Sequence, residues 1–495
     1  MRVRNNSLRR AELRSGAESG GSDALPRECR KEMNTRKTHS GSRRGVLVPA
    51  VAGLVVLALG GCTGIPTSDE KRAREDLDEV RAIYRPGGGK PSLPLLDGNA
   101  TLGTLLTYAI LNQPKVEAAY HDYAASVQRI TVERSLPDPR LTLELDIQDV
   151  VMTLMPGLMV EMPRFRRLRI RADEASAESR AKGFAFESAV LRSAYEVKKP
   201  LYQLRFLEDR IVIQRETLHL LYELEQSARA RVAAGRDTLQ DVLRAQMEQE
   251  RLKTEIENLE DSRNPLVAQL KAALGKAANE PNPPVPKEFE STPLDLSPDQ
   301  ILNMALVRNP RLKQMEAEVW MAEAGIRMAH QSRLPDIALG LEADVKASPT
   351  MWRPSLGATL PVWRDRIGAE IAAAQALKSA AQARLNAEQV QLAVEIADKS
   401  FVYRESTRSL SLLNESLLPK ARQSLQIARA SYATGRTDFI DVQDAGRSLL
   451  EFRLAQADAR IRRELALSEL SLLVIGVMPP QAPVPGAAQE TDRIK

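Results

Sequence analysis

The stretches AAGRDTLQDVLRAQ (residues 233–246) and ATGRTDFIDVQDAG (residues 433–446) decide the fold of this 495-residue chain. Each contains Gly-Arg, an Asp and a Thr in either order, two further residues and then Asp-Val. Other landmarks recur at offsets of 196 to 201 residues: Pro114 with Pro310, Pro137 with Pro335, Pro163 with Pro361 and Gly275 with Gly476. Because the offset drifts by only a few residues, the chain is a tandem duplication.

The composition favours long helices over a compact globular core. Aromatic residues make up only 4% of the chain, which is low for a compact core. Alanine, leucine, glutamate, arginine and glutamine dominate long stretches, as is typical of extended helices. The net charge of +5 is small for this length, so composition does not suggest nucleic acid as a partner.

Each repeat contains two segments that alternate as β-strands do. In RLTLELDIQ (residues 140–148) and IALGLEADV (337–345), apolar residues occupy every second position. GLMVEM (157–162) and SLGATL (355–360) follow the alternation more loosely. One apolar and one polar face fit a soluble sandwich and a lipid-facing barrel equally well, so the strands alone do not decide between them.

The predicted helices of each repeat match in length. Residues 164–232 predict one helix about 100 Å long, and helices over 102–134 and 238–274 together return about 105 Å beside it. Its apolar residues recur in steps of seven, as in a coiled coil: Val197, Leu204, Ile211 and Leu218. Such a rod is not a globular core. Four strands with open edges cannot cross a bilayer alone, so several subunits must contribute to any barrel.

The N-terminal region has the three parts of an export signal. RKTHSGSRRGVLVPAVAGLVVLALGGC (residues 36–62) runs from basic residues through a short apolar run to small residues and a cysteine. The apolar run 46–59 is too short for an ordinary membrane-spanning helix. Its end resembles a bacterial lipobox, which predicts that Cys62 is lipidated and begins the mature chain. The alternatives are an ordinary signal cleavage nearby or an uncleaved anchor.

These features divide the chain into six parts. We also expect translation to begin at Met33, because signal n-regions are short and 32 residues of polar, Gly/Ser/Arg-rich sequence precede this methionine. The parts are a signal region (1–61, of which 1–32 is the doubtful start), a lipidated extension (62–101), repeat one (102–277), a linker (278–300), repeat two (301–476) and a flexible tail (477–495).

The order of these motifs, present twice, resembles the TolC-type outer-membrane efflux proteins. The resemblance is carried by the QP and NP openings at 113–114 and 309–310, by LPD at 136–138 and 334–336, and by YATGRTDFIDVQDA and LSELSLLVIG in repeat two. It implies a mainly α protein with a small β part. Three copies would form a periplasmic α-barrel continuous with a twelve-stranded barrel in the lipid of the outer membrane.

The resemblance also implies a function and partners. The homotrimer would be the passive exit duct of a tripartite pump, with a periplasmic adaptor protein and an inner-membrane transporter as partners. The turns at Gly235 and Gly435, with Arg236 and Arg436, would form the periplasmic tips where the adaptor docks. The alternative is turn chemistry alone: each hairpin needs a glycine with positive φ. It also needs a helix cap, predicted as Thr238 with Asp241 and as Asp438 with Asp441.

A pore constriction is implied by four residues near these turns. Asp441 and Asp444 match positions where the family places a ring of carboxylates, and six such charges in a trimer would favour cations. The alternative is ordinary solvated acids near a helix start. Asp241 and Tyr432 match positions that link neighbouring helices in the closed family channel. The arginine often used in such links is not matched, because Thr437 occupies its place.

No catalytic or metal-binding constellation is present in the sequence, so we predict neither an enzyme nor a cofactor. None of the four histidines pairs with another at metal-ligand spacing. The segments SLPDPRLTLEL, LPVWRDRIGAEIAAAQA and LLPKARQSLQIARASYATGR look most like the heavy-metal efflux branch. Drug efflux or protein secretion would use the same duct. The competing class is a structural coiled-coil lipoprotein that tethers envelope layers.

Overall fold

A computed structural model gives the fold and describes residues 66–148, 151–236, 238–286, 296–345, 347, 349–479 and 482–484. The chain divides into two units, Met1–Thr63 and Gly64–Lys495, and every described residue lies in the second. Cys62, the apolar run 46–59 and Met33 lie outside the described residues, so lipidation, signal cleavage and the start site stay predictions.

The two repeats have the same order of elements. A helix α2 (Ser68–Tyr84) and a short 3-10 helix η1 (Pro86–Gly88) precede repeat one. Repeat one comprises α3 (Leu102–Asn112), α4 (Pro114–Arg134), β1 (Arg140–Gln148), β2 (Val151–Met162), α5 (Phe165–Ala233), α6 (Leu239–Asp261) and α7 (Arg263–Ala273). Repeat two comprises α8 (Pro298–Arg308), α9 (Pro310–Gln331), β3 (Ile337–Asp344), β4 (Met351–Ala358), α10 (Arg364–Leu412), the π-helix η2 (Leu413–Leu417), α11 (Leu418–Ala433), α12 (Phe439–Ser468) and the π-helix η3 (Glu469–Ile475).

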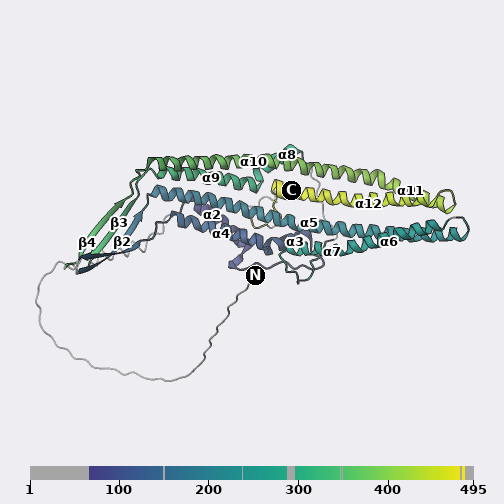
Figure 1. Ribbon diagram of the computed structural model, residues 1–495, viewed down its shortest axis with the longest axis horizontal. Helices are drawn as coiled ribbons and strands as arrows, with labels where there is room; N and C mark the ends of the chain where they lie inside the picture. The colour runs from purple at the N-terminus through teal and green to yellow at the C-terminus, as the bar shows by residue number, and fades with distance from the viewer. Residues whose placement is uncertain are drawn as a thin grey trace, which may run out of the picture. The chain divides into compact units, whose positions relative to one another are not determined.

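The 69-residue helix α5 is the central element of the second unit. It packs against α4 and α9 on the half nearer the strands, and against α6 and α12 on the other half. Figure 1 shows the strands at one end of these helices and the α5–α6 and α11–α12 turns at the other end. The predicted long helix and its antiparallel return path are therefore confirmed. Among the described residues, no helix combines the length and apolarity needed to cross a bilayer.

Each shorter stretch was predicted as one helix, and this was wrong at two points. The stretch 102–134 breaks at Gln113, because Pro114 disfavours a helical conformation in the residue before it. The stretch 238–274 ends its first helix at Asp261 and resumes after Ser262. Asp261 lies four residues before Pro265, whose ring would clash with the carbonyl at that position in a continuous helix.

At the start of each repeat's second helix, a buried amide closes the end of the returning helix. Gln113 Nε2 donates to the carbonyls of Ala272 and Ala273 at 3.0 and 3.1 Å. Asn309 Nδ2 donates to Leu473 and Val474 at 3.2 and 2.8 Å. The QP and NP openings therefore do the same work in both repeats, because each amide satisfies carbonyls left without partners at a helix C-terminus.

The four strands form one antiparallel sheet in the order β1-β2-β3-β4, so the two predicted strands per repeat are confirmed. β2 begins earlier than predicted, and β4 is shifted toward the N-terminus. The register places Leu141 opposite Leu158, and Leu158 opposite Leu341. On the other face, Gly157 pairs with Glu342, which pairs with Arg353. One face of the sheet is therefore apolar, and the other carries the charged side chains.

Both ends of the second unit pack into one apolar cluster. It joins α2, α3, α4 and α5 to residues after η3: Leu77, Val80, Tyr84, Ile110, Val116, Tyr120, Tyr123, Val127, Phe186, Val190, Ala482 and Val484. Ala482 and Val484 belong to the segment expected to be a flexible tail, yet both are buried. Their burial removes small apolar side chains from water, which the composition of the tail did not indicate.

Candidate functional site

The two hairpin tips have the same backbone geometry. Gly235 and Gly435 have φ values of 67° and 78°, so the prediction that each turn needs positive φ is confirmed. The amide of Arg236 donates to the Arg231 carbonyl at 3.0 Å, and that of Arg436 donates to the Ser431 carbonyl at 2.9 Å. Both arginine side chains are exposed at the surface of the protomer. The duplicated turn thus closes each long helix in the same way.

The helix caps after the two turns differ. At the start of α12, Asp438 and Asp441 form the predicted capping box, and the Asp438 amide donates to the Asp441 carboxylate at 3.3 Å. At the start of α6, Thr238 makes no side-chain cap, so that part of the prediction was wrong. The Asp241 carboxylate lies 3.5 Å from the Arg244 guanidinium, one turn further along the same helix.

One apolar cluster joins the two tips. It draws side chains from α5, α6, α11 and α12: Leu224, Ala228, Val242, Ala245, Leu425, Tyr432, Phe439 and Val442. The rings of Tyr432 and Phe439 meet edge to face, with centroids 5.9 Å apart. Tyr432 is only 2% exposed, so this residue links helices through packing as well as through its polar atoms.

The guanidinium that contacts Tyr432 comes from a residue that the sequence did not single out. The Arg231 guanidinium carbon lies 4.5 Å from the centroid of the Tyr432 ring, and its Nη1 donates to the Tyr432 carbonyl. Thr437, which stands where the family often has an arginine, has a buried hydroxyl that makes no hydrogen bond within the described residues. The Arg436 side chain turns back to the Thr434 hydroxyl at 3.1 Å.

The predicted constriction residues lie on two different hairpins. Asp441 and Asp444 are exposed near the start of α12. Asp241 lies near the start of α6 and is partly buried beside Arg244. Within one protomer the structure therefore brings Tyr432 into the tip core but leaves the two α12 carboxylates on the surface. A ring of these carboxylates requires further copies of the chain.

A buried carboxylate further up the first hairpin also escaped the sequence analysis. Glu225 on α5 accepts hydrogen bonds from Gln249 at 2.9 Å, from Arg229 at 2.7 Å and from Gln246 at 2.8 Å. The hydrogen bond from Gln249, followed by that from Arg229, lowers the pKa of Glu225 below its usual value of 4.5. These contacts join α5 to α6. In a helical repeat such a residue looks like any solvated glutamate, so its burial could not be predicted.

The helix before repeat one is fixed by a second buried carboxylate. Glu70 on α2 is fully buried, 2.6 Å from Nε of Arg134 and 2.8 Å from Nη2 of Arg74, and it accepts from Thr131 at 2.9 Å. Burial raises the pKa of Glu70, but the hydrogen bonds from Thr131 and Arg134 outweigh it and lower the pKa below 4.5. At the other end of α2, the Tyr84 ring packs at a tilt against the Tyr120 ring, with centroids 5.0 Å apart.

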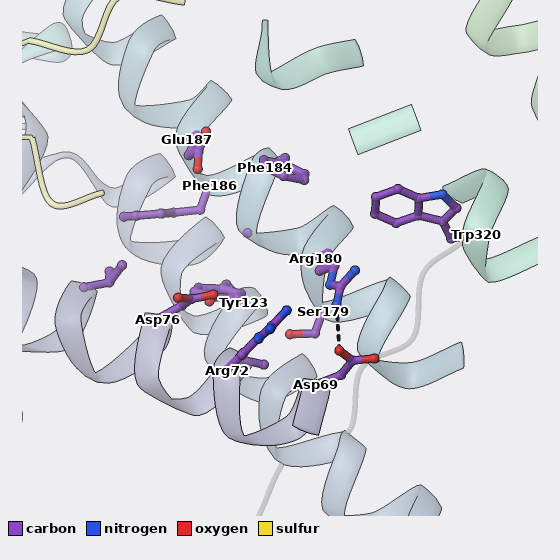
Figure 2. Close-up of a pocket in the computed structure, with 13 residues that line it drawn as sticks. Asp69, Arg72, Asp76, Tyr123, Ser179, Arg180, Phe184, Phe186, Glu187 and Trp320 are labelled. Atoms are coloured by element: carbon purple, nitrogen blue, oxygen red, sulfur yellow. Dashed lines mark hydrogen bonds and ion pairs between the residues drawn. The ribbon is translucent and has the colours of Figure 1, made fainter. Parts of the chain in front are cut away.

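A cavity of about 420 Å³ opens beside α2, between α5 and α9. Figure 2 shows Asp69 and Arg180 joined by an ion pair at its edge, with Trp320 of α9 facing Arg180. That pair is 3.0 Å long, and both side chains are about two-fifths exposed. Two polar contacts therefore hold the start of α2: the partly exposed Asp69–Arg180 ion pair and the buried contacts of Glu70. In the described residues, no group of three or more His, Cys, Asp or Glu side chains is placed to hold a metal ion.

Comparison with known proteins gives consistent matches over both repeats. The family model described as "Outer membrane efflux protein" matches residues 105–276 and 301–474. The cobalt-zinc-cadmium resistance protein CzcC of Cupriavidus metallidurans is 24% identical over 373 residues, which cover 72% of this chain and 85% of that protein.

Three solved structures share the fold. The outer-membrane channel OprN has a TM-score of 0.67 at 18% identity, covering 77% of this chain and 91% of that one. CusC has a TM-score of 0.66 at 19% identity, covering 78% and 97%. The open state of the Neisseria gonorrhoeae MtrE channel has a TM-score of 0.66 at 18% identity, covering 77% and 90%. The expected family is therefore confirmed.

Proposed function

Because this chain belongs to the outer membrane efflux protein family, we propose that three copies form the passive exit channel of a tripartite efflux pump. β1 and β4 are the two edges of the four-stranded sheet, and both offer unpaired backbone groups to another strand. Pairing β4 of one copy with β1 of the next would close twelve strands without an edge, as a bilayer requires. The helices would continue this barrel into the periplasm.

The observation that carries the proposal is the inverted burial of the sheet. Along β3, the apolar residues Ile337, Leu339 and Leu341 are exposed, whereas the opposite face, with Ala338, Gly340 and Glu342, is partly covered. Leu143 on β1 and Leu356 on β4 are 61% and 74% exposed. A soluble sheet buries its apolar face, so this arrangement favours lipid on the outside and water on the inside.

The tips are the proposed contact with the periplasmic adaptor. Gly235, Arg236, Gly435 and Arg436 are exposed at the end of the helices farthest from the sheet. An adaptor that approaches from the inner membrane would meet these turns first. Three copies would present six turns, and an inner-membrane transporter behind the adaptor would supply the energy, because the channel itself performs no chemistry in this proposal.

The proposed constriction is formed by the start of α12 from each copy. Asp441 and Asp444 would give six carboxylates around a narrow opening, which favours cations and opposes anions. Asp241 and Tyr432 would link neighbouring helices when the opening is closed. The exposed position of the two α12 carboxylates in a single protomer supports this assignment.

The lipid anchor is proposed at Cys62, and the position of α2 supports it. Glu70 contacts Thr131 and Arg134 at the end of α4 that leads into β1, so α2 begins near the strands. The six residue steps from Cys62 to Ser68 can span about 20 Å when extended. An acyl chain on Cys62 would thus lie within reach of the bilayer that holds the barrel.

Metal ions are the proposed cargo. The support is the likeness to CzcC, whose name records cobalt, zinc and cadmium resistance. Drug export or protein secretion would use the same duct, and a wide water-filled channel need not bind what passes through it. Resistance of a strain carrying the pump to cobalt, zinc and cadmium salts, with and without this chain, tests the cargo.

One experiment separates the channel from a coiled-coil tether. Outer-membrane fractions are run on SDS gels before and after heating, and purified chain is added to a planar bilayer. A channel gives heat-modifiable mobility and discrete conductance steps. A soluble rod with neither property would support the tether and contradict the proposal.

A further inference from the structure

Arg231 joins the tip of repeat one to the tip of repeat two. Its guanidinium lies over the Tyr432 ring at 4.5 Å and donates to the Tyr432 carbonyl. A Cβ added at Gly435 would sit 3.6 Å from Nη1, so the guanidinium also lies against the second turn. We propose that Arg231 is the positioning residue that latches the two hairpins of one protomer together at the proposed constriction. This inference rests on the proposed channel function.

The first argument is electrostatic. α5 ends at Ala233 and α11 ends at Ala433, and both helices run toward the tips. Each helix C-terminus carries about half a negative charge from its unpaired carbonyls, so two neighbouring C-termini repel each other. Arg231 lies in the last turn of α5 and donates to a carbonyl in the last turn of α11. One positive charge thus neutralises both ends.

The second argument comes from the duplication. With Gly235 and Gly435 as equivalents, Arg231 corresponds to Ser431, and Val232 corresponds to Tyr432. Repeat one supplies the cation and repeat two supplies the ring that it stacks on. The two copies therefore diverged in a complementary way at neighbouring positions. A turn that only needed to reverse the chain would not require this difference.

The third argument compares this contact with two ion pairs that join α5 to the helices of repeat two. Arg429 pairs with Glu223 at 2.6 Å, and Arg453 pairs with Glu216 at 2.6 Å. In each pair at least one side chain is about half exposed, and exposed ion pairs contribute little. Arg231 instead contacts the buried ring and the main-chain carbonyl of Tyr432, which are both held in place by the surrounding fold. Its contact therefore fixes the position of α11 more firmly than the two ion pairs do.

The test compares Arg231→Ala and Arg231→Lys with a control, Arg210→Ala. Arg210 lies on the same helix and pairs with Glu255 at 2.8 Å, a contact that stays inside repeat one. Full-length trimers in planar bilayers should open about tenfold more often with Arg231→Ala, the loss expected from a cation–π contact and a charged hydrogen bond. Arg231→Lys keeps a charge and a donor but not the planar stacking, so its effect should be intermediate.

Hydrogen exchange of the same trimers gives a readout that does not depend on conductance. The amides of Gly435 and Arg436, bonded to Tyr432 and Ser431 at 3.0 and 2.9 Å, should exchange about tenfold faster in Arg231→Ala. Arg210→Ala should leave them unchanged. Equal exchange in Arg231→Ala and wild type would overturn the latch. Faster exchange in a chain that never conducts would support the latch and contradict the channel.

Discussion

The buried carboxylate of Glu70 gives the sharpest prediction, because its neighbour in sequence is a natural control. Glu70→Gln keeps the shape of the side chain but removes the charge that Arg134 faces at 2.6 Å. Asp69→Asn makes the same chemical change one residue earlier, in a pair with Arg180 that is 3.0 Å long and partly exposed. Both residues lie in the first turn of α2.

The expected magnitudes differ because burial differs. Glu70 is 0% exposed and Arg134 is 11% exposed, so the variant leaves a cation in a poorly hydrated site. Breaking such a pair costs about 3 kcal/mol, which corresponds to about a hundredfold change in the opening equilibrium of α2. The Asp69 pair is screened by water, and its loss should cost at most about 1 kcal/mol.

Hydrogen exchange of the α2 amides measures the opening equilibrium directly in the full-length protein. Glu70→Gln should speed exchange across α2 about a hundredfold, and Asp69→Asn should speed it by less than about tenfold. Equal effects of the two variants would show that the apolar contacts of Leu77, Val80 and Tyr84 hold the helix without the buried charge. The reasoning about Glu70 would then be refuted.

Three further predictions concern the sheet, the turns and pH. Leu143→Lys places a charge on the exposed apolar face of β1, so it should lower the stability of the membrane-inserted protein by about 2–4 kcal/mol and reduce the amount of heat-modifiable trimer. Glu144→Lys changes the face that carries the charged side chains and should be tolerated. At Gly235 the only obstacle to a side chain is the positive φ, so Gly235→Ala should lower the free energy of unfolding by about 1 kcal/mol. Gly275→Ala also places a Cβ 2.8 Å from the Asn112 carbonyl oxygen, so it should lower the free energy of unfolding by about 1–3 kcal/mol more, as measured by thermal melting. Hydrogen bonds hold the pKa of Glu225 below 4.5, so the ionised carboxylate stabilises the fold above pH 4.5. This stabilisation is lost as the pH falls through the lowered pKa. The melting temperatures of wild type and Glu225→Gln should therefore differ near neutral pH and become equal at a pH below the lowered pKa.

Much of the fold could be predicted from patterns of residues that lie close together in the sequence. The length of α5 and the alternation of the strands depend on residues close in sequence, so they could be predicted. The break before Pro265 was also readable in principle, because a proline disturbs the carbonyl four residues earlier. The choice between a soluble and a lipid-facing sheet was not readable, since it depends on which face remains exposed after the helices have packed.

The site was less predictable because its contacts join distant residues. Arg231 and Tyr432 lie 201 residues apart, and nothing in either turn alone indicates that a guanidinium fits the ring of the other. Glu70 and Glu225 sit in charged helical stretches where most acids are solvated. Thr238 and Asp438 occupy equivalent turns, yet only Asp438 forms a capping box with the residue three positions later.

The packing of Ala482 and Val484 against α2 has a consequence for the order of maturation. A polypeptide exported from its N-terminus delivers α2 long before residues 482–484 emerge on the far side of the inner membrane. The apolar cluster into which α2 packs is then incomplete until translocation has almost finished. With the proposed acylation of Cys62, α2 would be tethered to the membrane but undocked until then, and its docking would mark a fully translocated molecule.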